Sequence, residues 1–105
     1  MTMAARISTL SAALVLSASP AMAATIEVTI EKLVFSPASV EAKMGDTIEW
    51  VNKDAFAHTA TVKGGWEVMI PPRSTGKMIL KAAGAVDYFC RFHPNMKGRI
   101  TVTAP

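Results

Sequence analysis

Cysteine, histidine and methionine, three side chains that bind soft metal ions, follow one another near the C-terminus. Cys90, His93 and Met96 form a C-x2-H-x2-M motif, Cys90 is the single cysteine of the chain, and His58 is the only other histidine. Two imidazoles and a thiolate in one plane, with a weak axial thioether, are the ligands of blue-copper electron-transfer sites. We therefore predict that His58, Cys90, His93 and Met96 bind one copper ion that alternates between Cu(II) and Cu(I).

Each of these residues also has a common structural role. A lone cysteine often packs as a small apolar residue, and a methionine often fills the core. The joint pattern favours copper, because both histidines and the only cysteine enter one arrangement beside a correctly spaced methionine. Structural zinc usually takes four Cys or His ligands, and this chain has three such residues. Catalytic zinc keeps one coordination position open for water. Met96 stands at the fourth position here, but as a weak ligand it does not fully exclude a catalytic zinc. The C-x-x-C-H motif of haem attachment is absent.

The first 23 residues have the pattern of a secretion signal. Residues 1–6 form a short region with one basic and no acidic residue, residues 7–18 are apolar or small, and Ala21-Met22-Ala23 has the small-x-small form of a cleavage site. A membrane anchor is the alternative, but the apolar stretch is short, interrupted by polar residues and ended by Pro20. We therefore expect residues 1–23 to be a cleaved signal peptide and residues 24–105 to form one compact copper-binding domain. The mature protein is then expected in the periplasm, without a membrane anchor.

Charge and cysteine content narrow the function further. The formal net charge is +3 and there is no basic run, which argues against nucleic-acid binding. In an oxidising compartment cysteines usually pair, but a single cysteine can only be buried, pair between chains or bind a metal. The position of Cys90 beside His93 favours metal binding.

The mature chain reads as short strands separated by turn residues. Ile26, Val28 and Ile30 alternate with polar residues, which is the period of a half-buried strand. Further strands are expected at 39–43, 47–52, 59–63, 77–81, 85–90 and 99–103, with 91–97 as a ligand loop and 66–70 unassigned. No convincing helical period follows residue 23. Seven or so short strands with turns between them predict an all-β, antiparallel sandwich, in which His58 comes from a strand distant in sequence from the other ligands.

Three stretches resemble the cupredoxins, or blue copper proteins, and among them the amicyanins. They are residues 35–37 together with 44–52 (MGDTIEWVN), residues 52–58 (NKDAFAH) and residues 88–98 (YFCRFHPNMKG). The short C-x2-H-x2-M loop is the most specific of the three. The resemblance implies a Greek-key β-sandwich of seven to eight strands with copper at one end.

The chain departs from the amicyanin pattern in two places. It is shorter between His58 and Cys90, around residues 64–72, so one strand is expected to be reduced or missing. Thr59 stands where the family often has an asparagine that ties the two ligand loops together, and either Thr59 or Asn52 is a candidate for that role.

The resemblance also implies a function. It is that of a periplasmic, monomeric, non-enzymatic carrier of one electron between a quinone-cofactor amine dehydrogenase and a c-type cytochrome. The edge of His93 is expected in an exposed apolar patch with a basic rim, formed by Phe56, Phe92, Pro94, Arg91, Lys97 and Arg99. A copper-binding protein for delivery or sequestration is the alternative. A copper oxidase or reductase is disfavoured, because it needs a second metal or an open position and the sequence has no second ligand cluster.

Overall fold

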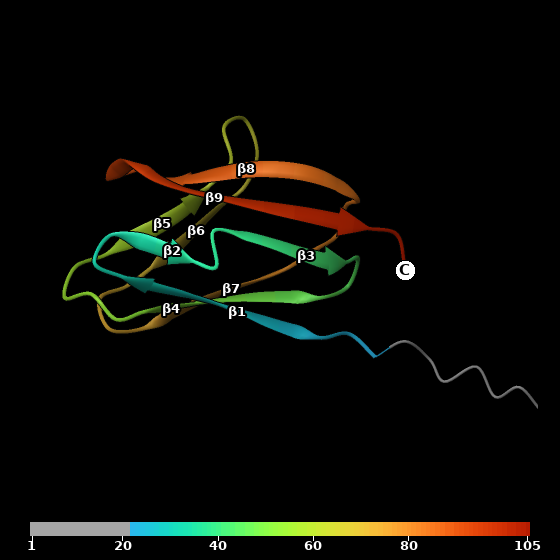
Figure 1. Cartoon of the computed structure of the whole chain (residues 1–105), viewed down its shortest axis with the longest axis horizontal. Helices are drawn as coiled ribbons and strands as arrows, with labels where there is room; N and C mark the ends of the chain where they lie inside the picture. The colour runs from blue at the N-terminus through green and yellow to red at the C-terminus, as the bar shows by residue number, and fades with distance from the viewer. Residues whose placement is uncertain (1–21) are drawn as a thin grey trace, which may run out of the picture.

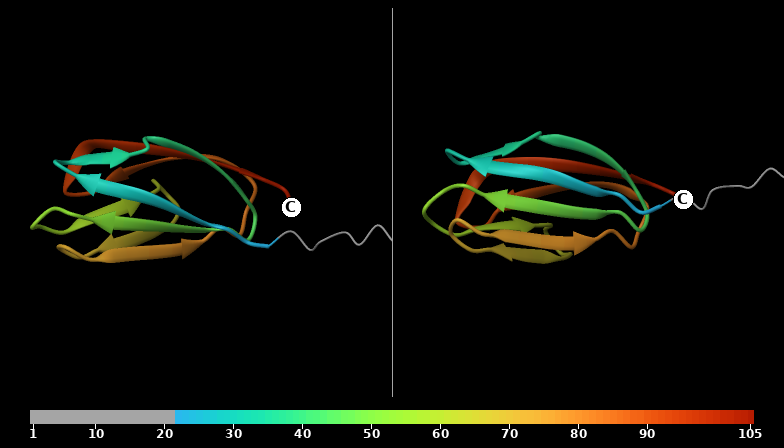
Figure 2. Two further views of the ribbon diagram at one scale, coloured as in Figure 1. Left: turned by 60° about the horizontal axis from the view of Figure 1, so that its bottom comes forward. Right: turned by 90° about the horizontal axis from the view of Figure 1, so that it is seen from below.

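The computed structural model describes residues 22–105, in which all regular structure is β-strand. The predicted signal peptide therefore lies almost entirely outside the described residues. Two sheets pack face to face as a sandwich (Figures 1 and 2). The nine strands are β1 (Thr25–Glu31), β2 (Val34–Ser36), β3 (Ser39–Lys43), β4 (Thr47–Asn52), β5 (His58–Thr61), β6 (Glu67–Ile70), β7 (Thr75–Ile79), β8 (Gly84–Cys90) and β9 (His93–Thr103). Within the described range, no helix is long and apolar enough to cross a membrane.

The strand order confirms the all-β sandwich and corrects the expectation of a purely antiparallel one. One sheet has the order β2-β1-β4-β7 and the other β3-β9-β8-β5-β6. Two pairs, β1 with β4 and β3 with β9, are parallel. Parallel neighbours need a crossover connection, and here the chain crosses between the sheets from β2 to β3, which the period-two pattern of single strands cannot reveal.

The core follows the alternation seen in the sequence. In β4, Ile48 and Trp50 are fully buried, and in β9 Ile100 and Val102 point inward. Trp50 and Tyr88 meet edge to face between the sheets, and the Trp50 indole N–H donates to the Tyr88 hydroxyl over 3.3 Å. Burial raises the pKa of Tyr88 to about 12, and the bond from Trp50 offsets only part of that rise.

The strands expected at 59–63 and 77–81 are found one or two residues earlier, as β5 and β7, and three further segments differ from the sequence-based assignment. Trp66–Ile70 was unassigned, and Glu67–Ile70 of this segment forms β6. Val34–Ser36, where the sequence predicts no separate strand, forms the short strand β2, which raises the strand number to nine. The predicted ligand loop, 91–97, is reduced to a two-residue turn, because β9 already begins at His93 and pairs with the end of β8.

Four connections gather at one end of the sandwich, on the left of Figure 1. They are the turns or loops between β1 and β2, β4 and β5, β6 and β7, and β8 and β9. The start of β1 and the C-terminus lie at the opposite end (Figure 1). The predicted ligands His58, Cys90 and His93 therefore share one end of the fold and Ala24 lies at the other.

Candidate metal centre

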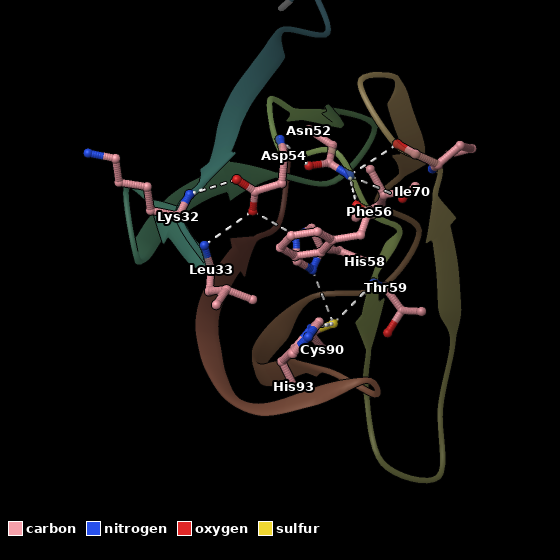
Figure 3. Close-up of polar contacts among 11 residues, drawn as sticks. Lys32, Leu33, Asn52, Asp54, Phe56, His58, Thr59, Ile70, Cys90 and His93 are labelled. Atoms are coloured by element: carbon pink, nitrogen blue, oxygen red, sulfur yellow. Dashed lines mark hydrogen bonds and ion pairs between the residues drawn. The ribbon is translucent and has the colours of Figure 1, made fainter.

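Strand ends place the three strongest donors of the predicted site. Cys90 is the last residue of β8 and His93 the first of β9, and the turn at 91–92 makes them register partners across the hairpin. His58 is the first residue of β5, which pairs with β8 in the same sheet. The structure thus brings together the only cysteine and both histidines of the chain (Figure 3).

Their separations fit a single metal ion. Cys90 Sγ lies 3.6 Å from His58 Nδ1 and 3.8 Å from His93 Nδ1, and all three donor atoms lie within 4.8 Å of one another. Bonds of about 2.3 Å to sulfur and about 2.05 Å to nitrogen would separate the two donors by about 3.8 Å at a trigonal angle. Cys90 and His58 are fully buried and His93 is half-buried, so the donors face an interior point close to the surface.

Asp54 orients the imidazole of His58. Its Oδ2 lies 2.8 Å from His58 Nε2, and the two side chains are 10% and 0% exposed (Figure 3). A neutral imidazole donates through one ring nitrogen and accepts through the other, and an ionised carboxylate can only accept. His58 therefore donates from Nε2, and the lone pair on Nδ1 points toward Cys90. A carboxylate behind a ligand histidine is a common means of fixing its tautomer and orientation in metal sites.

The same carboxylate holds the turn between β1 and β2. It accepts backbone N–H bonds from Lys32 over 2.8 Å and from Leu33 over 3.2 Å. Both turn residues have positive φ, 53° and 64°, a conformation that side chains with a Cβ rarely adopt. Burial raises the pKa of Asp54, but the bonds from His58, Lys32 and Leu33 outweigh it, so the pKa lies below its usual value.

Thr59 and Asn52, the two candidates for tying the ligand loops, act at different places. The Thr59 backbone N–H donates to Cys90 Sγ over 3.4 Å, and its hydroxyl accepts the N–H of Arg91 over 2.8 Å. Thr59 thus joins the His58 strand to the Cys90–His93 hairpin. The Asn52 side-chain amide donates to the carbonyls of Phe56 and Pro71, which ties the β4–β5 loop to the β6–β7 loop.

A ring of hydrogen bonds surrounds the turn after Cys90. The Thr59 and Thr61 hydroxyls lie 2.8 Å apart, and Thr61 donates to Glu67 over 2.8 Å. Glu67 in turn accepts from the Arg91 side chain over 2.8 Å, and the Arg91 backbone returns to Thr59. Strand β6, which the sequence left unassigned, therefore braces the hairpin that carries Cys90 and His93.

Met96 is buried in β9, with 3% of its surface exposed, and belongs to the same apolar cluster as Cys90. A thioether so close in sequence to His93 is compatible with a weak axial position. Its assignment as the fourth ligand stays a prediction.

An exposed aromatic ring lies beside the half-buried imidazole of His93. The ring centroids of Phe56 and His93 lie 5.7 Å apart, and Phe56 and Phe92 are each 46% exposed. The Arg91 guanidinium lies over the Phe92 ring at 4.9 Å. The expected basic rim is partly neutralised, because Arg91 pairs with Glu67 and Arg99 pairs with Asp87, each over a short surface contact.

Sequence reasoning missed Asp54 and Glu67. Both are ordinary charged residues in a loop and on a short strand, and nothing in their local sequence indicates that they approach His58 or Arg91. Asp54 meets His58 four positions further along the chain, through the β4–β5 loop. Its contacts with Lys32 and Leu33, and that of Glu67 with Arg91, span 21 to 24 positions and exist only in the folded arrangement.

Comparison with known proteins agrees with this geometry. The family described as Cupredoxin-like domain matches residues 4–102. Amicyanin-alpha of Methylorubrum extorquens is 34% identical over 78% of this chain and 75% of its own length. The methylamine utilization protein MauL of the same species is 35% identical over 94% of this chain and 93% of its own length. The structure of an oxidized amicyanin mutant superposes with a TM-score of 0.68 at 27% identity, over 74% of this chain and 81% of the mutant.

Proposed function

This chain belongs to the cupredoxin family, and we propose that it is a periplasmic blue copper protein that carries one electron at a time. The observation that supports this most is the convergence of its only cysteine and both of its histidines at one end of the sandwich. We assign His58, Cys90 and His93 as the strong copper ligands and Met96 as the weak axial ligand. Bound there, copper would supply reversible one-electron exchange between Cu(II) and Cu(I).

The protein's part in this chemistry is to hold the donors still. His58 is held by Asp54, Cys90 accepts a backbone N–H from Thr59, and His93 is set by its pairing with Cys90 in the hairpin. All of these restraints come from the strands or from the bonded loops beside them. Because the donor atoms cannot move far when copper changes its oxidation state, the structural rearrangement that accompanies electron transfer stays small. The half-buried ring of His93, beside the exposed Phe56, is the proposed route for the electron.

The relatives supply the proposed partners. Two of the similar proteins carry the names amicyanin and methylamine utilization protein. On this basis we propose an amine dehydrogenase as electron donor and a c-type cytochrome as acceptor. A small apolar patch around His93 suits such partners, because redox complexes are small and must dissociate quickly. Export by residues 1–23 would place the protein in the periplasm with them.

The visible absorption spectrum tests this function. Copper(II) added to the purified domain is expected to give an intense blue band that ascorbate bleaches and an oxidant restores. Replacing Cys90 by Ala is expected to abolish the band while leaving the far-ultraviolet circular dichroism of the sandwich unchanged. A blue band that persists in Cys90→Ala would contradict the ligand assignment.

The same measurement separates the alternative function. A wild-type protein that binds copper(II) tightly but stays colourless, and passes the ion to a chelator or acceptor protein, would indicate copper delivery or sequestration. Redox cycling without loss of copper would indicate electron transfer.

A further inference from the structure

Strand β1 starts at the end of the sandwich where the C-terminus lies (Figure 2), and Ala24 comes directly before it. The Ala24 nitrogen lies 2.8 Å from Asp46 Oδ1, and the Ala24 carbonyl accepts the backbone N–H of Thr47 over 2.9 Å. Strand β1 starts at the next residue. Ala24 therefore lies just before the β1–β4 ladder and bonds to the first residue of β4, and its nitrogen is directed at a carboxylate.

Asp46, the partner of the Ala24 nitrogen, is a charged side chain that is almost fully buried. Only 7% of Asp46 is accessible, although it carries a charge, and it lies in the turn between β3 and β4. Its second oxygen accepts the Lys43 backbone N–H over 2.9 Å. Two backbone donors satisfy this buried carboxylate, but no described side chain forms an ion pair with it. Buried carboxylates are costly unless a positive charge or several hydrogen bonds compensate them.

We propose that signal cleavage between Ala23 and Ala24 creates the missing cation, so that the new α-ammonium of Ala24 pairs with Asp46 and stabilises the mature domain. Before cleavage the Ala24 nitrogen is a neutral amide with a single proton. Hydrolysis of the Ala23–Ala24 peptide bond by one water leaves a carboxylate on Ala23 and an amine on Ala24, which takes up a proton. The ammonium keeps the bond to Asp46 Oδ1 and adds a full charge to it, and charge-assisted hydrogen bonds are about twice as strong as neutral ones.

The inference rests on the export and cleavage proposed above, but it is independent of copper. Strand β1 has seven residues and spans about 23 Å between Ala24 and the turn that contacts Asp54. A change at Ala24 is therefore expected to alter the stability of the fold and to leave the metal centre unchanged.

Two titrations limit the pH range of this pair. An α-amine in an unfolded chain titrates near pH 7.7–8.0, and a carboxylate partner raises its pKa in the fold. The contribution is complete below that range and is lost as the pH rises through the raised pKa. Bonds from Ala24 and Lys43 lower the pKa of Asp46, so the contribution is also lost as the pH falls through that lowered value. The stabilisation is therefore expected to be largest between about pH 4 and pH 7.5.

Other charges near the pair are few. Glu41 and Lys43 line the same hollow as Ala24 and Asp46, with Thr101 and Thr103 of β9 on its other side. Lys43 adds a favourable charge interaction with Asp46. Neither side chain makes an ion pair with Asp46 in the described structure, so both leave the carboxylate to the α-ammonium.

The test compares the exported protein with an N-acetylated form of the same sequence. Acetylation keeps the Ala24 N–H and its bond but removes the charge, so it isolates the ammonium. We expect the exported protein to begin at Ala24 by intact mass and its amine to titrate above pH 8 by NMR. The free-amine form should melt about 4–8 °C above the acetylated form at pH 6 and at the same temperature at pH 10.

Asp46→Asn is expected to abolish the difference between the two forms, whereas Asp87→Asn, a matched change at an exposed carboxylate, should preserve it. Equal melting temperatures of free and acetylated protein at pH 6, an amine that titrates at pH 7.7–8.0, or a different first residue would overturn the inference. If Asp46→Asn does not fold, the amine pKa of the wild-type protein decides alone. None of these readouts depends on a blue spectrum, so failure of the copper function would be seen separately.

Discussion

Replacing Asp54 by Asn tests the coupling between the metal centre and the β1–β2 turn. The carboxylate accepts three N–H groups, those of Lys32, Leu33 and His58. An asparagine has one oxygen, and its NH2 group would face an N–H donor. If the asparagine oxygen faces His58 and Leu33, the Lys32 N–H has no acceptor. If the oxygen faces Lys32, the fully buried His58 has no acceptor.

The size of the effect follows from the loss of charge and of one acceptor. Removing the partner behind a metal-bound histidine typically lowers metal affinity by about 10–100-fold, or about 1.4–2.8 kcal/mol. Asp54 and His58 are almost fully buried, so solvent screening reduces this loss of affinity only slightly. Loss of a negative charge weakens the binding of Cu(II) more than that of Cu(I). For each factor of ten by which the Cu(II) affinity falls further than the Cu(I) affinity, the reduction potential rises by about 59 mV.

Competition with a chelator of known affinity measures copper(II) binding, and voltammetry measures the potential. Asp87→Asn is the matched control, because it removes the same charge from a carboxylate that is 77% exposed and far from the ligand contacts. The control is expected to bind copper within about threefold of wild type, as surface charges contribute little. A folded Asp54→Asn protein with wild-type affinity and potential would refute the coupling and leave Asp54 only the role of holding the turn.

The remaining predictions concern the core. Tyr88 is the single tyrosine, and because its pKa is raised to about 12, its contribution to stability should be complete below about pH 10 and lost as the pH rises toward 12. Near-ultraviolet absorption should therefore show phenolate forming together with unfolding, and ionisation near pH 10 in a folded protein would contradict this. Gly98→Ala should lower the free energy of unfolding by about 1–3 kcal/mol in urea, because the added Cβ would overlap the Tyr88 ring, which Phe35 and Trp50 hold in place. A loss under about 0.5 kcal/mol would show that the ring can move.

Strands with a clear alternation were predictable from the sequence. The bounds of Ser39–Lys43 and Thr47–Asn52 agree with the structure, because alternating apolar residues report burial directly. Glu67–Ile70 was not predictable, since its alternation of exposed and inward residues extends over only four positions and its placement depends on pairing with β5. The start of β9 at His93 was also hidden, because Pro94 and Asn95 are typical of loops and only the pairing with β8 makes this segment a strand.

The sequence by itself determined the chemistry of the candidate site. Ligand identity is a property of side chains, so one cysteine, two histidines and a spaced methionine indicate copper before any fold is known. The nearness of Cys90 and His93 also follows from sequence, because three residues of separation suit a tight hairpin.

Tertiary structure alone decided which residues hold these donors. The carboxylate of Asp54 meets His58 four positions away through the conformation of the β4–β5 loop. The hydroxyl of Thr59 and the ion pair of Glu67 with Arg91 act across 32 and 24 positions, which sheet order brings together. The same holds for Asp46, which meets the start of the fold through the parallel pairing of β1 with β4. Local sequence reports burial and propensity, but the partner of a buried charge is set by which strands lie side by side.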